Sequence, residues 1–294
     1  MAALAKSLPG NAPGEFFVDA TCIDCDTCNW LAPSVFDDGG DGHSRVHRQP
    51  GDAGQRLRAE MALLACPVGA IGTREKHDLA AARAAFPERI AGSAGVEVYH
   101  LGYHAEASFG AASYLVRRAG DNVLVDSPRF TAPVVGALER LGGVRAMFLT
   151  HQDDVADHAK FRARFGCERI LHAHDVTRGT RDVERKVEGV EPVALAPDLL
   201  VIPVPGHTRG SACLLVDETF LFSGDHVAWS DERGQICAFR DSCWYDWQEL
   251  RRSMARLAGH RFEWILPGHG RRCHFPAARM KAEMRRCLDW MADA

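Results

Sequence analysis

Apolar residues recur along the first part of the chain with short periods that predict a small mixed module. Short strands are expected at residues 15–18 and 44–47, and an apolar-periodic helix at residues 55–64. A cysteine-rich loop and a Gly/Asp stretch at residues 37–42 lie between the two strands. These features predict a compact domain over residues 14–74.

The pattern changes after a charged, alanine-rich stretch at residues 75–95, which contains Pro87 and is predicted to be a linker. Beyond it, short runs of branched residues alternate with helical patterns. Strands are predicted at 113–116, 123–125, 146–149, 169–171, 200–204, 213–216, 220–222 and 264–266, and helices at 132–141, 155–165, 247–257 and 277–291. This mixture, without an internal repeat, predicts a second α+β domain over residues 96–294.

Composition supports two globular domains and argues against several classes of partner. The 294 residues are 46% hydrophobic and 25% charged, with a formal net charge of −4. A charge balance of this kind creates no field that would attract nucleic acid or an anionic membrane. The sequence has no apolar run of about 18 residues and no signal peptide, so we expect a cytoplasmic protein with a small-molecule substrate.

Four cysteines have the spacing of an iron–sulfur site. Cys22, Cys25 and Cys28 lie on one short loop, and Cys66, which precedes a proline, can provide a fourth thiolate. A [4Fe–4S] cluster takes one such ligand for each iron, and no further cysteine follows Cys28 at the spacing of a two-cluster protein. The alternative is a structural zinc ion, which also accepts four thiolates, although zinc sites usually pair Cys-x-x-Cys knuckles. The segment resembles single-cluster bacterial ferredoxins over most of residues 14–74.

Histidines and aspartates follow several of the predicted strands in the second domain. They occur in the segments Thr150-His151-Gln152-Asp153-Asp154, Asp157-His158, Pro205-Gly206-His207-Thr208, Ser223-Gly224-Asp225 and Pro267-Gly268-His269-Gly270. Imidazoles and carboxylates on turns at strand ends can bind two borderline cations, which lower the pKa of bound water and polarise a substrate oxygen.

The order of these segments resembles the metallo-β-lactamase superfamily, which includes glyoxalase II-like thioester hydrolases. The resemblance covers about residues 96–275 and implies an αββα sandwich with two divalent metals, zinc or iron. It implies that His207 binds the first metal, Asp225 bridges the pair, and Asp157, His158 and His269 bind the second. Asp157 would also orient the attacking water. Asp126 corresponds to an aspartate that supports the site from outside the ligand shell.

One segment departs from the family pattern His-x-His-x-Asp-His. If His151 keeps the first ligand position, Asp153 replaces the second histidine and the loop bulges before Asp157. An alignment fixed without a gap on Asp157-His158 would instead place Asp153 and Val155 at the two histidine positions that precede the Asp-His pair of the family pattern. We prefer the bulged alignment. A carboxylate here is similar to the flavodiiron branch of the superfamily and suits iron.

Several neighbouring residues are interpreted as structural. Asp154 is expected to cap the helix at residues 155–165, and His226 to be a structural group. Trp244, Tyr245 and Trp247 either line a substrate entrance or pack against the following helix, and we favour packing.

Three functions fit the sequence. The first is a hydrolase in which a metal-activated hydroxide attacks a small thioester, lactone or ester. The second is a non-haem iron oxidoreductase, similar to flavodiiron proteins or persulfide dioxygenases, that receives electrons from the cluster and needs an external redox partner protein. The third is a non-enzymatic iron–sulfur sensor, which would require that His151 and Asp153 bind no metal.

Overall fold

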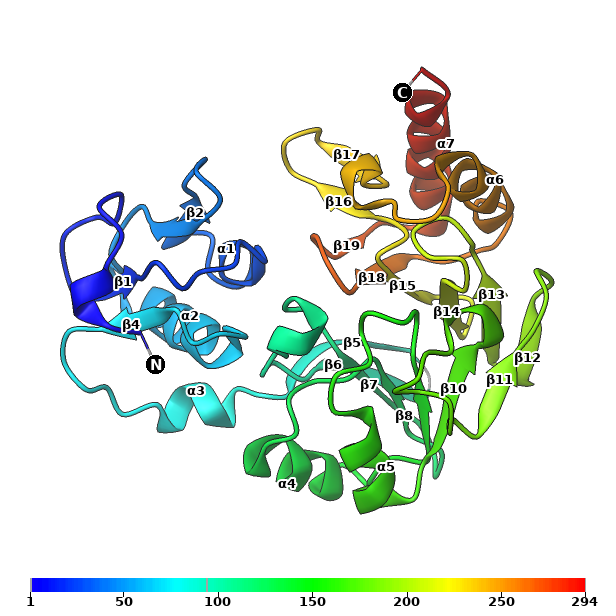
Figure 1. Ribbon diagram of the computed structural model, residues 1–294, viewed down its shortest axis with the longest axis horizontal. Helices are drawn as coiled ribbons and strands as arrows, with labels where there is room; N and C mark the ends of the chain where they lie inside the picture. The colour runs from blue at the N-terminus through cyan, green and yellow to red at the C-terminus, as the bar shows by residue number, and fades with distance from the viewer. Residues whose placement is uncertain (1, 94, 294) are drawn as a thin grey trace.

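The computed structural model describes residues 2–93 and 95–293. Its N-terminal region is a small α+β unit, coloured blue to cyan in Figure 1. Its elements are the 3-10 helix Leu4–Lys6, β1 (Phe16–Val18), α1 (Thr27–Leu31), β2 (Phe36–Asp38), β3 (Ser44–Val46), α2 (Ala53–Ala65) and β4 (Ile71–Thr73). β1 pairs with β4 and β2 pairs with β3, both antiparallel, so the beginning and end of the unit lie together.

Local sequence signals explain the boundaries of α2. The Asp52 carboxylate accepts a hydrogen bond from the Gln55 backbone N–H at 2.8 Å, which satisfies one of the free donors at the helix start. The helix ends at Ala65, because Pro67 disfavours the helical conformation in Cys66. The predicted helix and both predicted strands are confirmed, with shifts of at most two residues at their ends.

The segment expected as a linker contains a short helix and a strand that joins the large sheet. α3 (Ala80–Ala84) is followed by β5 (Glu88–Ser93), which pairs antiparallel with β6 (Val96–His100) at the edge of a large sheet. Ile90 and Ala91 pack against the sandwich core, and a register shift between Arg89 and Ala91 obscures the alternation that marks a strand. We therefore propose that the second domain begins at residue 88.

Two sheets form the body of the second domain (Figure 1). The first has the order β11-β10-β9-β8-β7-β6-β5, and the second has the order β12-β13-β14-β15-β18-β19. The further strands of the first sheet are β7 (Tyr114–Arg117), β8 (Val123–Val125), β9 (Ala146–Phe148), β10 (Glu168–His172) and β11 (Arg185–Val187). Those of the second are β12 (Val193–Ala196), β13 (Leu199–Pro203), β14 (Ala212–Val216), β15 (Phe220–Gly224), β18 (Trp264–Pro267) and β19 (Cys273–His274). β16 (Ala228–Ser230) and β17 (Gln235–Cys237) form a separate hairpin.

Side chains along the strands point alternately to the core between the two sheets and to the helices outside them, so that helices and sheets form four layers. In β14, Leu214 packs in the core between the sheets, whereas Leu215 packs outward in a separate core with α6 (Trp247–Leu257) and α7 (Ala277–Asp293). In β8, Val125 faces inward and Leu124 packs outward with α4 (Ala132–Arg140) and α5 (His158–Phe165). Each sheet is therefore buried on both faces, and the expected αββα sandwich is confirmed.

None of the helices in the described ranges combines the length and apolar character needed to cross a bilayer.

Candidate metal and iron–sulfur sites

The four N-terminal cysteines line one enclosed cavity. Cys22 and Cys25 lie on the loop after β1, Cys28 is on α1, and Cys66 follows α2. Asp24 and Asp26 adopt positive φ angles of 58° and 60° between the cysteines, a conformation that aspartate tolerates better than most residues. These two left-handed positions bend the loop tightly.

Burial makes the thiolate forms costly without a bound cation. It raises the pKa of the Cys25 thiol to about 11 and the pKa of Cys28 well above its usual value. The Ala70 backbone N–H donates to Cys66 Sγ at 3.2 Å, a hydrogen bond that favours negative sulfur. Cysteine sulfurs gathered around one cavity fit the donor set of a [4Fe–4S] cluster, so these residues would hold it.

The second site lies where strand ends from both sheets meet. Asp126 follows β8, His151 follows β9, His207 follows β13, Asp225 directly follows β15, and His269 follows β18. β8 and β9 are parallel, as are β15 and β18, so their carboxyl ends bring these side chains to one edge.

Two groups of possible ligands share Asp225. The first consists of His151, His207 and Asp225, and the second of Asp154, Asp225 and His269; within each group the donor atoms lie within 4.8 Å of one another. Asp225 Oδ2 is 3.7 Å from both His151 Nε2 and His207 Nε2. This arrangement suits a carboxylate that bridges two cations.

Asp153 lies beside the two histidines of the first group. Its Oδ2 lies 3.9 Å from both His151 Nε2 and His207 Nε2, and its side chain is half exposed. The preferred alignment, in which the loop bulges and Asp153 takes the position of a histidine, agrees with this placement.

Buried ligand atoms point into the site without hydrogen-bond partners. They are His151 Nε2, His207 Nε2 and both carboxylate oxygens of Asp154. The other ring nitrogens are held in place, because His151 Nδ1 lies 3.0 Å from Thr150 Oγ1 and His207 Nδ1 lies 2.5 Å from Ser242 O. Metal-binding histidines typically have one oriented and one free nitrogen, so these residues fit bound cations.

Asp126 supports the first group through Thr150. Its carboxylate accepts hydrogen bonds from the Thr150 N–H at 2.8 Å and the Thr150 hydroxyl at 3.1 Å, and that hydroxyl also contacts His151. Burial raises the pKa of Asp126 to about 8. The position agrees with the supporting role that the family resemblance implies.

Asp157 and His158 are not brought to the ligand groups. The Asp157 carboxylate accepts from the Phe130 N–H at 2.7 Å and pairs with Lys160 at 2.7 Å, and His158 Nδ1 lies 3.1 Å from Arg169 Nη1. The reason is a turn over residues 151–157, which delays the start of α5 to His158.

Asp154 takes their place, so its interpretation as a helix cap was wrong. It is only 1% exposed and lies beside Asp225 and His269, whereas residue 157 stands at the helix start. Gly268 permits this approach, because an added Cβ would lie 2.7 Å from Asp154 Oδ2 and 2.9 Å from Asp225 Oδ1. The two adjacent aspartates, Asp153 and Asp154, were the sequence feature that could have pointed to a ligand here. Helix-capping preferences alone could not show which of the two side chains faces the metal site.

Charges within the second group are strongly coupled. Burial opposes a charged imidazolium, but the Asp225 carboxylate outweighs it and raises the pKa of His269 to about 10. Burial also favours neutral Asp225, but the charge and hydrogen bond of His269 hold its pKa well below the usual range. Burial and the Asp225 charge raise the pKa of Asp154. The excess of carboxylates requires a cation, which His269 supplies here.

Exposed aromatic side chains flank the metal site. Trp244, 67% exposed, lies 6.2 Å from His207 between ring centroids, and Phe109, 54% exposed, lies 6.0 Å from His269. Trp247 instead packs edge-on against Trp290. The packing interpretation therefore holds for Trp247 but was wrong for Trp244, which lies beside the site. His226 is buried and outside both ligand groups.

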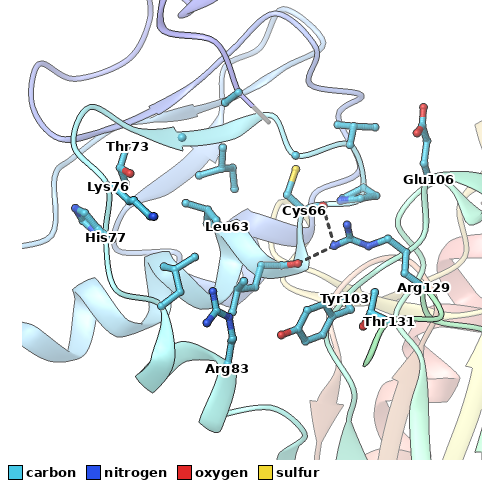
Figure 2. A pocket seen from close by; sticks show the side chains of 18 of the residues that line it. Leu63, Cys66, Thr73, Lys76, His77, Arg83, Tyr103, Glu106, Arg129 and Thr131 are labelled. Carbon is cyan, nitrogen blue, oxygen red and sulfur yellow. Dashed lines mark hydrogen bonds between the residues drawn. The ribbon is translucent and has the colours of Figure 1, made fainter. Parts of the chain in front are cut away.

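The two regions of the chain are joined by direct contacts. Figure 2 shows the Arg129 guanidinium reaching from the second domain to the carbonyl oxygens at the end of α2, Leu64 at 2.8 Å and Cys66 at 3.3 Å. Arg58 on α2 also pairs with Glu88 at 2.6 Å. The cysteine site is therefore fixed against the second domain.

Comparisons with known proteins agree with this architecture. Residues 18–73 match the family described as the 4Fe-4S single cluster domain of Ferredoxin I. A hydroxyacylglutathione hydrolase from Anaeromyxobacter dehalogenans is 37% identical over 123 residues, which are 40% of this chain and 46% of that protein. The chain spans about half the length of the curated relatives it matches.

Solved structures share the fold at low sequence identity. The mono-zinc form of the metallo-β-lactamase FIM-1 from Pseudomonas aeruginosa has a TM-score of 0.53 at 16% identity, covering 70% of this chain and 96% of that one. A structure described as a peroxy diiron species of the chemotaxis sensor ODP has a TM-score of 0.53 at 17% identity, covering 70% and 94%. The chain thus joins a single-cluster 4Fe–4S domain of the ferredoxin type to a domain with the metallo-β-lactamase fold.

Proposed function

We propose that the second domain is a metal-dependent hydrolase acting on a small thioester, lactone or ester. The observation that carries this proposal is the convergence of unpartnered, buried ligand atoms from both sides of Asp225. His151, Asp153 and His207 would hold one cation and Asp154 and His269 the other, with Asp225 shared. Bound metals lower the pKa of water and polarise a carbonyl oxygen.

The chain's own residues would position the substrate and ligands. The exposed rings of Trp244 and Phe109 flank the site and offer apolar surface to the non-reacting part of a substrate. Asp126 and Thr150 hold His151 in one orientation. The similarity to hydroxyacylglutathione hydrolases supports a thioester as the first substrate class to examine.

Hydrolysis of a panel of thioesters, lactones and esters tests this proposal. We expect Asp225→Asn to remove both metals and to lower kcat/KM by at least about a hundredfold, the loss of about 2.7 kcal/mol of transition-state stabilisation. Asp121→Asn, a change at an exposed loop far from both ligand groups, should leave hydrolysis unchanged. Hydrolysis that survives in Asp225→Asn would contradict the proposal.

A second candidate is an iron oxidoreductase fed with electrons by the cluster. It is favoured by Asp153, a carboxylate where the family pattern has an imidazole, because hard oxygen ligands suit iron better than a third nitrogen does. The contact between the cysteine site and the second domain also favours it. The fold shared with the chemotaxis sensor is compatible with a diiron centre.

Metal analysis of protein purified without oxygen separates the two candidates. About four irons with one or two zinc ions per chain favour the hydrolase. About five or six irons without zinc favour the oxidoreductase.

A further inference from the structure

The loop between β6 and β7 touches both sites at adjacent residues. Gly110 lies against the cysteine site: an added Cβ would be 2.8 Å from Cys25 Cβ, 2.9 Å from Cys25 Sγ and 3.2 Å from Pro67 Cγ. Its φ angle of 89° also favours glycine. The Gly110 backbone is thus in van der Waals contact with Cys25 and with the proline that follows Cys66.

The preceding residue contacts the metal site. The Phe109 carbonyl oxygen accepts a hydrogen bond from His269 Nε2 at 3.2 Å, whereas His269 Nδ1 faces the Asp225 carboxylate at 2.8 Å. This is the arrangement expected of a metal-binding histidine, which donates its outer N–H to a carbonyl oxygen. One peptide unit, Phe109–Gly110, therefore separates the surroundings of the two sites.

Buried polar groups hold the next peptide unit, Gly110–Ala111, in place. The Gly110 carbonyl oxygen lies 2.6 Å from His104 Nδ1 and accepts from the Thr27 hydroxyl at 3.2 Å. Thr27 Oγ1 also lies 3.4 Å from Cys25 Sγ. His104 is fully buried, and its Nε2 lies 2.8 Å from His100 Nε2. The loop is thus held by Thr27 of the cluster domain and by His104 of the loop itself.

We propose that the Phe109–Gly110 peptide unit is the electron-transfer route from the cluster to the metal site. The route consists of the contact between Cys25 and Gly110, one peptide unit and the hydrogen bond to His269. Thr27 positions Gly110 against Cys25. The inference rests on the second candidate function.

The electron balance of the step is simple. The cluster is oxidised from [4Fe–4S]⁺ to [4Fe–4S]²⁺, and one ferric ion held by Asp154, Asp225 and His269 is reduced to ferrous iron. No bond forms or breaks and no proton moves. A low-potential one-electron carrier of the ferredoxin or flavoprotein class would reduce the cluster again.

The experiment follows the electron without substrate. The whole chain, with its cluster and with ferric iron in the second site, receives one reducing equivalent of dithionite per chain and is frozen after set times. The EPR signal of the reduced cluster and the signal of ferric iron are then measured. Protein with zinc in the second site is the reference, because it offers no acceptor and should keep a reduced cluster.

Three variants and one control examine the route. Gly110→Ala should slow decay of the reduced-cluster signal by at least about tenfold, equivalent to a higher activation free energy. Gly120→Ala is the matched control, because Gly120 has nearly the same φ angle, 85°, with no atom within 4 Å of an added Cβ; it should behave as wild type. Thr27→Val should slow the transfer severalfold, and Thr27→Ser should restore it.

The outcomes distinguish the route from the function. Wild-type transfer rates in both Gly110→Ala and Thr27→Val, at full cluster and iron content, would overturn the route and leave the second candidate function standing. If Gly110→Ala loses its cluster, Thr27→Val decides alone. A wild-type chain that retains a reduced cluster beside ferric iron would overturn both the route and the second candidate function. If the native protein holds only zinc in the second site, the second candidate function is contradicted. The chain loaded with iron in that site still tests the route.

Discussion

The cysteine site and the metal site differ in how the chain builds them. Three of the cysteine ligands lie within one short loop, Cys22 to Cys28, and the fourth ends a helix that packs on α1. The ligands of the metal site come from turns after β9, β13, β15 and β18, which belong to two sheets. A local loop fixes its ligands by covalent spacing, whereas a distributed site depends on the conformation of every turn that contributes to it.

The difference explains which residues could be placed from sequence. Cys22, Cys25, Cys28 and Cys66 line one cavity as their spacing indicated. In the metal site, His207, Asp225 and His269 also come together, because each follows the end of a strand by one to four residues. The turn after β9 departs from the ligand set that the family resemblance implies, since the chain turns over residues 151–157 and Asp154, rather than Asp157, lies beside Asp225 and His269.

The largest expected effect is the loss of the cluster from the cysteine site while the second site keeps its metal. Cys25→Ser should abolish the visible absorption of the cluster, because serine offers a harder oxygen in place of a soft sulfur ligand. The second site should still bind metal, since none of its ligands lies in the cysteine loop. Iron and zinc content and the visible spectrum measure both parts.

Cys243→Ser is the matched control for this change, because Cys243 is a free, partly exposed cysteine outside the cluster loop. An unchanged spectrum in Cys25→Ser would contradict the cluster assignment. Loss of both metal populations would show that the two sites do not form independently.

The next effect distinguishes two neighbouring aspartates. Asp154→Asn should weaken metal binding in the second site by at least about tenfold to a hundredfold, since it removes a charged oxygen ligand. Asp157→Asn should leave metal content unchanged and cost about 1 kcal/mol of stability through weaker bonds to Phe130 and Lys160. Competition with a metal-binding dye and urea unfolding measure the two quantities.

The opposite result would restore the ligand set implied by the family pattern. Metal lost from Asp157→Asn and retained in Asp154→Asn would mean that the turn rearranges when metal binds. Each variant serves as the control of the other, because the same chemical change is made three residues apart.

Sequence patterns gave the layers of the fold more reliably than its edges and turns. Strands such as β14 are continuous apolar runs buried on both faces, so they are visible in the sequence. β5 was taken for part of a linker and β11 and β12 were not predicted, because edge strands alternate weakly and carry charged residues such as Arg89 and Lys186. The contact between Cys25 and Gly110 joins residues far apart in the chain, so no local pattern could reveal it.

The smallest predicted effect concerns the junction between the two regions, where Glu88 of β5 links them. Its carboxylate pairs with Arg58 on α2 at 2.6 Å and with Arg272 at 3.1 Å. Burial would raise the pKa of Glu88, but His100, Arg272 and Arg58 together hold it well below the usual range. The charged carboxylate therefore stabilises the folded chain.

Glu88→Gln should accordingly lower the free energy of unfolding at pH 7 by about 1 to 3 kcal/mol, because a neutral amide leaves two guanidinium groups without a carboxylate. The depressed pKa makes the wild-type contribution fully present above the unfolded value of about 4.3, and it is lost as the pH falls below that value. Urea unfolding should show a constant difference between the two proteins from pH 7 to about pH 5, which shrinks only as the pH falls below about 4.3 toward the depressed pKa of Glu88. Glu249→Gln, in an exposed helical pair with Arg252, should change stability by no more than about 0.5 kcal/mol. Equal stability of wild type and Glu88→Gln at pH 7 would mean that Glu88 does not contribute to holding the two regions together.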